Sequence, residues 1–203
     1  MKYLIFLAVA TVVVISVFGQ PLSKGGASPV TAKSAPPAYI SESPLPKGWP
    51  SPGPFNEVTE KHYPASRVAL TVGSSPNFSF WTLFKHIRRN GIPMSSPVEM
   101  AMKDEPSGSM KMHQMGFLYQ STEVGTTGAD GDDVIVRDLH PLVVLSYTWQ
   151  GPRDEKSLSK ARAAITAVLT DRHLHSSEYR LLGYNSPSVP KKKQTHELQA
   201  VIK

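Results

Sequence analysis

Hydrophobic alternation and helical spacing follow one another twice along this chain. In the first half, residues 68–72 alternate between apolar and polar positions, which predicts a strand. Apolar residues then recur at helical spacing over 80–87, and Asn90-Gly91 marks the end of that helix. Two further alternating segments, 98–102 and 110–120, predict a hairpin.

The second half repeats this order of elements. Residues 142–149, rich in β-branched and aromatic side chains, predict a strand. A helix follows, and its buried stripe is formed by Leu158, Ala161, Ile165, Val168 and Leu169. Residues 179–184 and 196–202 predict two more strands, and 134–137 a short extra strand between the halves.

Each half therefore reads strand–helix–strand–strand. Two such halves predict an α+β fold, in which an antiparallel, barrel-like sheet carries two helices packed on it. The interface between the halves is the expected place for a ligand cleft.

The first 55 residues differ in composition from these halves. Residues 1–19 combine Lys2 with an uncharged apolar run and small residues before a cleavage position, which predicts a signal peptide and export, with an uncleaved membrane anchor as the alternative. Residues 20–55 hold half of the prolines, together with Ser, Gly and Ala, and predict a disordered linker. The folded domain is expected over 56–203.

Charge and cysteine content narrow the function classes. The chain has no cysteine, which excludes disulfides, thiolate catalysis and cysteine-ligated metal sites. Its formal charge is +6, but part of this excess precedes residue 56, so the domain is only mildly basic and nucleic-acid binding is not expected. Membrane contact is expected only through an uncleaved N-terminal segment, and the sequence leaves the oligomeric state open.

Several segments resemble the SOUL/heme-binding protein family. They are Tyr63-Pro64-Ala65-Ser66-Arg67-Val68-Ala69, Phe80-Trp81-Thr82-Leu83-Phe84-Lys85-His86-Ile87, Asn90-Gly91-Ile92-Pro93-Met94-Ser95-Ser96-Pro97-Val98-Glu99-Met100, Met115-Gly116-Phe117-Leu118-Tyr119, and Leu181-Leu182-Gly183-Tyr184-Asn185-Ser186-Pro187 with Glu197. The family usually has Met-Thr-Ala-Pro-Val where this chain has Met-Ser-Ser-Pro-Val. The resemblance covers nearly all of 56–203 and implies the same barrel-like sheet with two helices.

The resemblance also implies tetrapyrrole binding, which some members of the family show. The leading hypothesis is therefore a non-enzymatic module that binds heme or another tetrapyrrole in an apolar cleft. The candidate contacts with that ligand are Phe84, Met94, Met100 and Tyr184. His86 is the candidate iron ligand, because an imidazole nitrogen can coordinate heme iron. The alternative for His86 is a half-buried histidine near the end of a helix.

Two further functions remain open at this stage. Glu99 is expected to point away from Val98 and Met100, and on a cleft face it would serve as the general base of a small-molecule hydrolase. Met110, Met112, His113 and Met115 form a thioether-rich stretch that would suit copper, although the alternation of the methionines favours core packing.

Overall fold

The computed structural model describes residues 37–73 and 76–202. The predicted signal peptide and the first part of the predicted linker lie outside these described residues. In the part of the chain that is described, no helix is long and apolar enough to cross a membrane.

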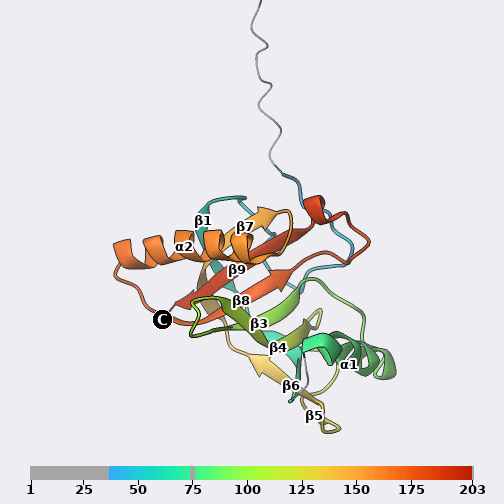
Figure 1. Ribbon diagram of the computed structural model, residues 1–203. Helices are drawn as coiled ribbons and strands as arrows, with labels where there is room; N and C mark the ends of the chain where they lie inside the picture. Colours follow the sequence, from blue (N-terminus) through green and yellow to red (C-terminus); the bar gives the residue numbers. More distant parts are fainter. Residues whose placement is uncertain (1–36, 74–75, 203) are drawn as a thin grey trace, which may run out of the picture. The chain divides into compact units, whose positions relative to one another are not determined.

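The described residues form nine strands, two α-helices and one short 3-10 helix, and the predicted α+β class is confirmed (Figure 1). In chain order they are β1 (Val58–Tyr63), β2 (Ser66–Thr71), α1 (Pro76–Arg89), β3 (Val98–Asp104), β4 (Met110–Leu118), β5 (Gly128–Asp130), β6 (Val134–Leu139), β7 (Leu142–Gln150), α2 (Glu155–Asp171), β8 (Ser176–Gly183), η1 (Lys191–Lys193) and β9 (Thr195–Ile202).

All nine strands belong to one open antiparallel sheet in the order β1-β7-β9-β8-β3-β4-β2-β6-β5. The two halves meet at the β3–β8 pair, where Met100 lies opposite Leu181. On either side of this seam the order is the same, β3-β4-β2 in the first half and β8-β9-β7 in the second. The predicted repeat is therefore present in the topology.

In each half one strand lies outside the strand–helix–strand–strand order and pairs with the other half; of these two strands, β6 was predicted at 134–137 and β1 was not. β1 precedes the first repeat but pairs with β7, and β6 precedes the second repeat but pairs with β2. β1 was not predicted, because Lys61 occupies one of its buried positions and breaks the apolar alternation. The exchange of first strands ties each half to the other through backbone hydrogen bonds.

Both helices cover the same face of the sheet. α1 packs on β4 and β2, and α2 packs on β7 and β9 (Figure 1). Leu83, Ile87 and Ile165 from the helices are buried in one apolar core with strand residues of both halves. Asp154 caps α2 by accepting a hydrogen bond from the Ser157 backbone amide, which fixes where that helix begins.

The helix-free face carries a second apolar cluster. Its buried members are Trp49, Tyr63, Val68, Leu118, Val144, Leu182 and Tyr184. Trp49 belongs to residues 37–56, named the arm below, which packs on this face although most of it falls in the predicted linker 20–55. The Lys47 amide donates to the Gln120 carbonyl at 2.8 Å, and the Ser96 amide donates to the Pro44 carbonyl at 3.0 Å. The difference arises because Trp49 is buried there together with Pro46 and Pro52, so this part of the chain supplies apolar area that its composition did not indicate.

Candidate functional site

The helix-free face is organised around the buried carboxylate of Glu197 on β9. Alternation along β9 places Leu198 and Ala200 in the helix-side core and turns Glu197 and Gln199 to the other face. The carboxylate accepts hydrogen bonds from Lys61 Nζ (2.9 Å), Tyr63 Oη (3.0 Å), Ser146 Oγ (2.6 Å), Thr148 Oγ1 (3.2 Å), Tyr184 Oη (3.0 Å) and Gln199 Nε2. These donors come from β1, β7 and β9 and from the residue after β8, and together with Glu197 they are named the Glu197 network.

The charge states of this network follow from burial and from Lys61. Burial alone would raise the pKa of Glu197, but the adjacent Lys61 ammonium and the hydrogen-bond donors outweigh it, so the pKa lies below its usual value. Burial raises the pKa of Tyr63 and of Tyr184, and the Glu197 charge adds to both shifts. At neutral pH Glu197 is therefore ionised and both phenols are neutral donors. Such a saturated carboxylate is suited to holding strands together rather than to proton transfer.

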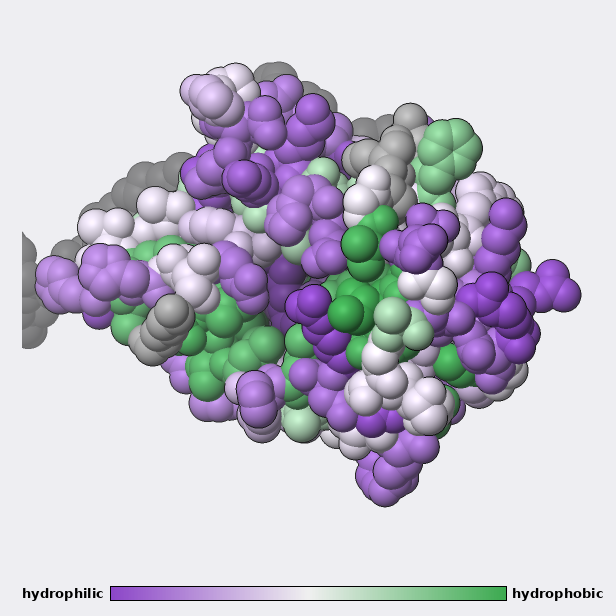
Figure 2. Space-filling model, turned by 90° about the horizontal axis from the view of Figure 1, so that it is seen from below, coloured by the Kyte–Doolittle hydropathy of each residue, from purple (hydrophilic) through white to green (hydrophobic). Residues whose placement is uncertain are grey.

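A pocket of about 330 Å³ opens on the same face, next to this network. Its volume lies at the small end of the range for ligand sites, about 300–1,000 Å³. The lining residues are Val68, Leu70, Glu99, Ala101, Gln114, Gly116, Leu139, His140, Pro141, Leu142, Glu178 and Arg180. Seen from below, the surface shows apolar areas set among hydrophilic residues (Figure 2). The pocket thus combines an aliphatic wall with two carboxylates and one guanidinium.

Arg180 connects the pocket to the Glu197 network. Its Nη1 donates to Glu99 Oε2 at 3.0 Å, and its Nε donates to Gln199 Oε1 at 2.6 Å. The guanidinium carbon lies 4.9 Å from the ring centre of Tyr63 and 5.6 Å from that of Trp49. Nη2 is buried and has no hydrogen-bond partner among the described residues. Arg180 therefore retains donor capacity that the surrounding protein does not use.

A different surface, on α1, exposes a run of aromatic rings. Phe78 is 68% exposed, Trp81 59% and Phe80 37%, and half-buried Phe84 continues the run. Phe80 contacts both Trp81 and Phe84, with ring centres 5.5 and 6.0 Å apart. The Arg88 guanidinium lies 5.9 Å above the Phe84 ring.

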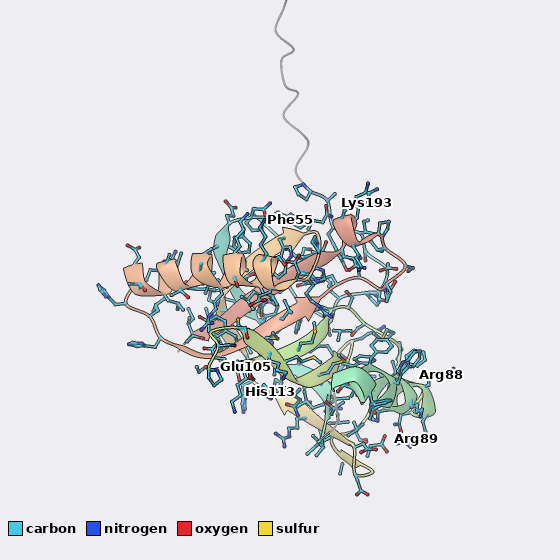
Figure 3. All side chains as sticks on the ribbon, in the orientation of Figure 1. Phe55, Arg88, Arg89, Glu105, His113 and Lys193 are labelled. Carbon is cyan, nitrogen blue, oxygen red and sulfur yellow. The ribbon has the colours of Figure 1, made fainter. Side chains whose placement is uncertain are left out.

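The exposed cations of this helix border the rings. Lys85 and Arg88 are both exposed, and Arg88 lies at the C-terminal end of α1 beside Arg89 (Figure 3). Arg89 is committed to an ion pair with Asp130 at 2.6 Å. The rings of Phe78, Phe80, Trp81 and Phe84 together with Lys85 and Arg88 are named the α1 patch.

The predicted iron ligand His86 lies beneath this patch. The side chain is buried, its Nδ1 pairs with Asp130 Oδ2, and its Nε2 hydrogen-bonds the Tyr119 hydroxyl at 2.6 Å. Hydrogen bonds from Arg89 and from His86 hold the pKa of Asp130 well below its usual value, and burial raises the pKa of Tyr119 to about 12. Both ring nitrogens of His86 are occupied, so this histidine is not free to ligate iron.

The other predicted tetrapyrrole contacts do not converge on one cleft. Phe84, Met94 and Met100 belong to the helix-side core, whereas Tyr184 lies on the opposite face in the Glu197 network. Met100 is buried, and its sulfur accepts a hydrogen bond from Arg153 Nη1. Of these residues, Phe84 belongs to the α1 patch.

The thioether-rich stretch also divides. Met110, Met112 and Met115 pack in the helix-side core. A β-bulge in the β3–β4 pairing leaves His113 exposed, as Figure 3 shows near the β3–β4 hairpin. Among the described residues, no group of three or more His, Asp or Glu side chains is placed to hold a metal ion.

Sequence reasoning missed the residues that organise the helix-free face. Lys61, Arg180 and Glu197 are charged residues inside strands, at positions that alternation turns toward one face. A charged residue buried within a strand is rare unless it is paired. Their positions inside strands therefore indicated, from the sequence alone, that these three charged residues are paired with one another or with polar neighbours.

Solved structures with the same fold were found at low sequence identity. A cryo-EM structure of an EcmrR–DNA complex is 13% identical with a TM-score of 0.57; the match covers 72% of this chain, and this chain spans 57% of EcmrR. A crystal structure of the EcmrR C-terminal domain is 14% identical with a TM-score of 0.54, covering 72% of this chain and 97% of that domain. An uncharacterized conserved protein from Listeria innocua is 11% identical with a TM-score of 0.55, covering 74% of this chain and 94% of its own. At these identities the likeness concerns the fold alone.

No curated protein matches the chain. The model of the SOUL heme-binding protein family matches residues 53–200. This span includes all nine strands and both helices, apart from the end of β9. The chain therefore belongs to the SOUL heme-binding protein family.

Proposed function

We propose that the chain binds a tetrapyrrole, either heme or an iron-free porphyrin, on the α1 patch. The observation that carries this proposal is the run of exposed aromatic rings bordered by Lys85 and Arg88. Membership in a heme-binding family supports the ligand class. With the export that the N-terminus predicts, such a module would act as a carrier or scavenger outside the cytoplasm.

The chemistry of the patch matches that ligand. Contiguous exposed aromatic surface is uncommon on soluble proteins and marks an interaction site. Because the Trp81 ring stands at 89° to that of Phe80, a flat ligand ring would bury apolar area against the face of Trp81, at about 25 cal/mol per Å² before the costs of association. The carboxylate groups of the porphyrin would pair with Lys85 and Arg88 at the border of the patch. The apolar part of the affinity requires no metal ligand.

Hemin and iron-free protoporphyrin should therefore bind with affinities within about threefold of each other. The physical reason is that His86 is held by Asp130 and Tyr119 and offers no free nitrogen to iron. Absorbance titrations of the purified protein in the Soret region, run in parallel for the two ligands, measure this ratio. A preference for hemin above about thirtyfold would contradict the proposal and show that iron is ligated.

Replacing Trp81 with alanine should weaken binding of both porphyrins by about tenfold, since stacking on one aromatic side chain contributes about 1–3 kcal/mol. Phe55→Ala is the matched control, because Phe55 lies near β7, away from α1 (Figure 3). Equal losses in the two variants would place the ligand elsewhere. Unchanged affinity in Trp81→Ala would remove the α1 patch from the proposal.

A second candidate function concerns the pocket on the helix-free face. Glu99 lines it, and only Oε2 is engaged by Arg180, which leaves Oε1 to act as a general base on a bound water. If the pocket hydrolyses small esters, Glu99→Gln should lower turnover of 4-nitrophenyl acetate by at least about 100-fold, while Gln114→Ala alters it far less. Equal turnover in wild type and Glu99→Gln would exclude this candidate.

A further inference from the structure

The arm covers the helix-free face with several side chains, among them Trp49, Tyr39 and Leu45, and of these three Trp49 is the most buried. Trp49 is only 7% exposed, and its ring meets that of Tyr63 edge to face with centres 4.7 Å apart. Its Nε1 is buried and has no acceptor among the described residues. The unpartnered Nη2 belongs to Arg180, whose guanidinium carbon lies 5.6 Å from the Trp49 ring centre. Two buried donors without partners thus occur side by side where the arm meets the sheet.

The packing of Trp49 on this face is less stable than its buried area indicates. A buried donor that loses water without gaining an acceptor opposes the closed arrangement. Apart from an isolated bridge between Phe55 and Thr148, the arm pairs with no strand, and separate hydrogen bonds along its length, rather than a continuous ladder, join it to the rest of the protein. Its most extensive polar anchor is exposed Glu42, which accepts from the Ser186 amide and hydroxyl at 2.8 Å each. Segments held in this way open at lower free energy than paired strands do.

The surface beneath Trp49 continues into the pocket. Val68, Leu70, Leu139 and Leu142 line the pocket and also belong to the cluster in which Trp49 packs. Displacing the indole would extend the pocket along this aliphatic wall toward Tyr63 and Tyr184, which belong to the same cluster. The enlarged space would have aromatic rings at one end and Arg180 at its side.

We propose that this face is a second ligand site, distinct from the α1 patch, for a flat aromatic ring that carries a carboxylate. The ring takes the place of the Trp49 indole, and a carboxylate oxygen accepts from Arg180 Nη2. The Glu197 carboxylate does not select a cation here, because Lys61, the hydroxyls and Gln199 already saturate it. Trp49 then acts as an internal competitor that the ligand must displace.

Titration calorimetry with 2-naphthoate tests this competition. All proteins carry Trp81→Ala, so that the α1 patch does not contribute. Trp49→Ala should bind 2-naphthoate at least about tenfold more tightly than this background, because the apparent affinity scales with the fraction of molecules in which the site is open. Glu42→Ala, which releases the anchor without touching the site, should tighten binding by about threefold. Circular dichroism confirms that each variant is folded. The proposal is overturned if neither Trp49→Ala nor Glu42→Ala binds 2-naphthoate more tightly than the background protein.

Probes of opposite charge test whether the site selects a carboxylate or binds any apolar ring of this size. In Trp49→Ala, 2-naphthylmethylamine has the same ring and the opposite charge, and it should bind at least about tenfold more weakly than 2-naphthoate. Arg180→Met in the same background should remove this preference. If the amine binds as well as the carboxylate before Arg180 is replaced, the assignment of the carboxylate to Arg180 is wrong.

Discussion

Replacing Glu197 with glutamine should lower the free energy of unfolding by about 3–5 kcal/mol. The loss arises because Lys61, which is 7% exposed, keeps its charge in a buried position after its partner has become neutral. The new amide group also places its own hydrogens where Lys61, Tyr184 and Thr148 donate to Oε2. At least one buried donor then loses its acceptor.

Urea unfolding at pH 7, followed by circular dichroism, measures this loss. The slope of the free energy against urea concentration should stay unchanged, since the two proteins expose the same surface on unfolding. Asp138→Asn is the control: it removes an exposed ion pair with Arg67, 2.7 Å long, and should have a much smaller effect. The double variant Lys61→Met/Glu197→Gln should recover part of the stability, because no buried charge remains without a partner. A loss below about 1 kcal/mol in Glu197→Gln would show that Lys61 is solvated in solution.

The Glu197 network explains how the exchanged strand β1 stays in place. β1 contributes Lys61 and Tyr63 to the network, and their side chains extend across β7 to Glu197 on β9. β1 is an edge strand, with a backbone ladder on one side only. Its two inward side chains therefore supply the attachment that a second neighbouring strand would otherwise give.

Local patterns predicted the elements that obey a single period. The two helices α1 and α2 follow helical spacing in the sequence, and the predicted strands β2, β3, β4, β6, β7, β8 and β9 follow alternation or a β-branched and aromatic composition. β1 was not predicted, because its buried positions hold Lys61 and Tyr63. The partner of both side chains is Glu197, 136 and 134 residues further along the chain. Pairing of β1 with β7 depends on such distant contacts, which no local window contains.

The same limit applies to the candidate sites. His86 was considered as an iron ligand from its residue type, whereas its environment is set by Tyr119 and Asp130, 33 and 44 residues away. Its spacing from Leu83 and Ile87 already places it near the buried side of α1. Phe84 was correctly placed on that helix, but spacing alone did not show that Trp81 beside it is exposed. The proline-rich composition of the arm predicted a disordered linker and gave no indication that Trp49 would be buried on the sheet.

His196 should make the protein less stable by about 2 kcal/mol on going from pH 8 to pH 5. Burial, and then the nearby Arg153 guanidinium, lower the pKa of this histidine in the folded protein to about 4, from an ordinary value of 6.5. The side chain is 4% exposed, its ring lies 5.4 Å from that of Trp149, and neither ring nitrogen meets a described partner at hydrogen-bond distance and angle. As the pH falls below 6.5, the unfolded chain takes up a proton that the folded protein accepts only near pH 4. Stability is therefore lost in this window and is fully present above it.

Replacing His196 with phenylalanine should remove this dependence, because the aromatic volume stays against Trp149 while the titrating group is lost. Urea unfolding of both proteins at pH 8, 7, 6 and 5 measures it, and pH 5 lies above the ordinary pKa of carboxylates such as Glu197, so most of these groups stay ionised in the unfolded chain. His113→Phe, at an exposed position, should keep the wild-type slope. A slope that persists in His196→Phe would assign the proton uptake to another group. If the stability of His196→Phe does not change between pH 8 and pH 5, the His196 ring is neutral in the folded wild-type protein. Protonation of this one residue, where β9 pairs with β7, then accounts for the loss of stability in acid.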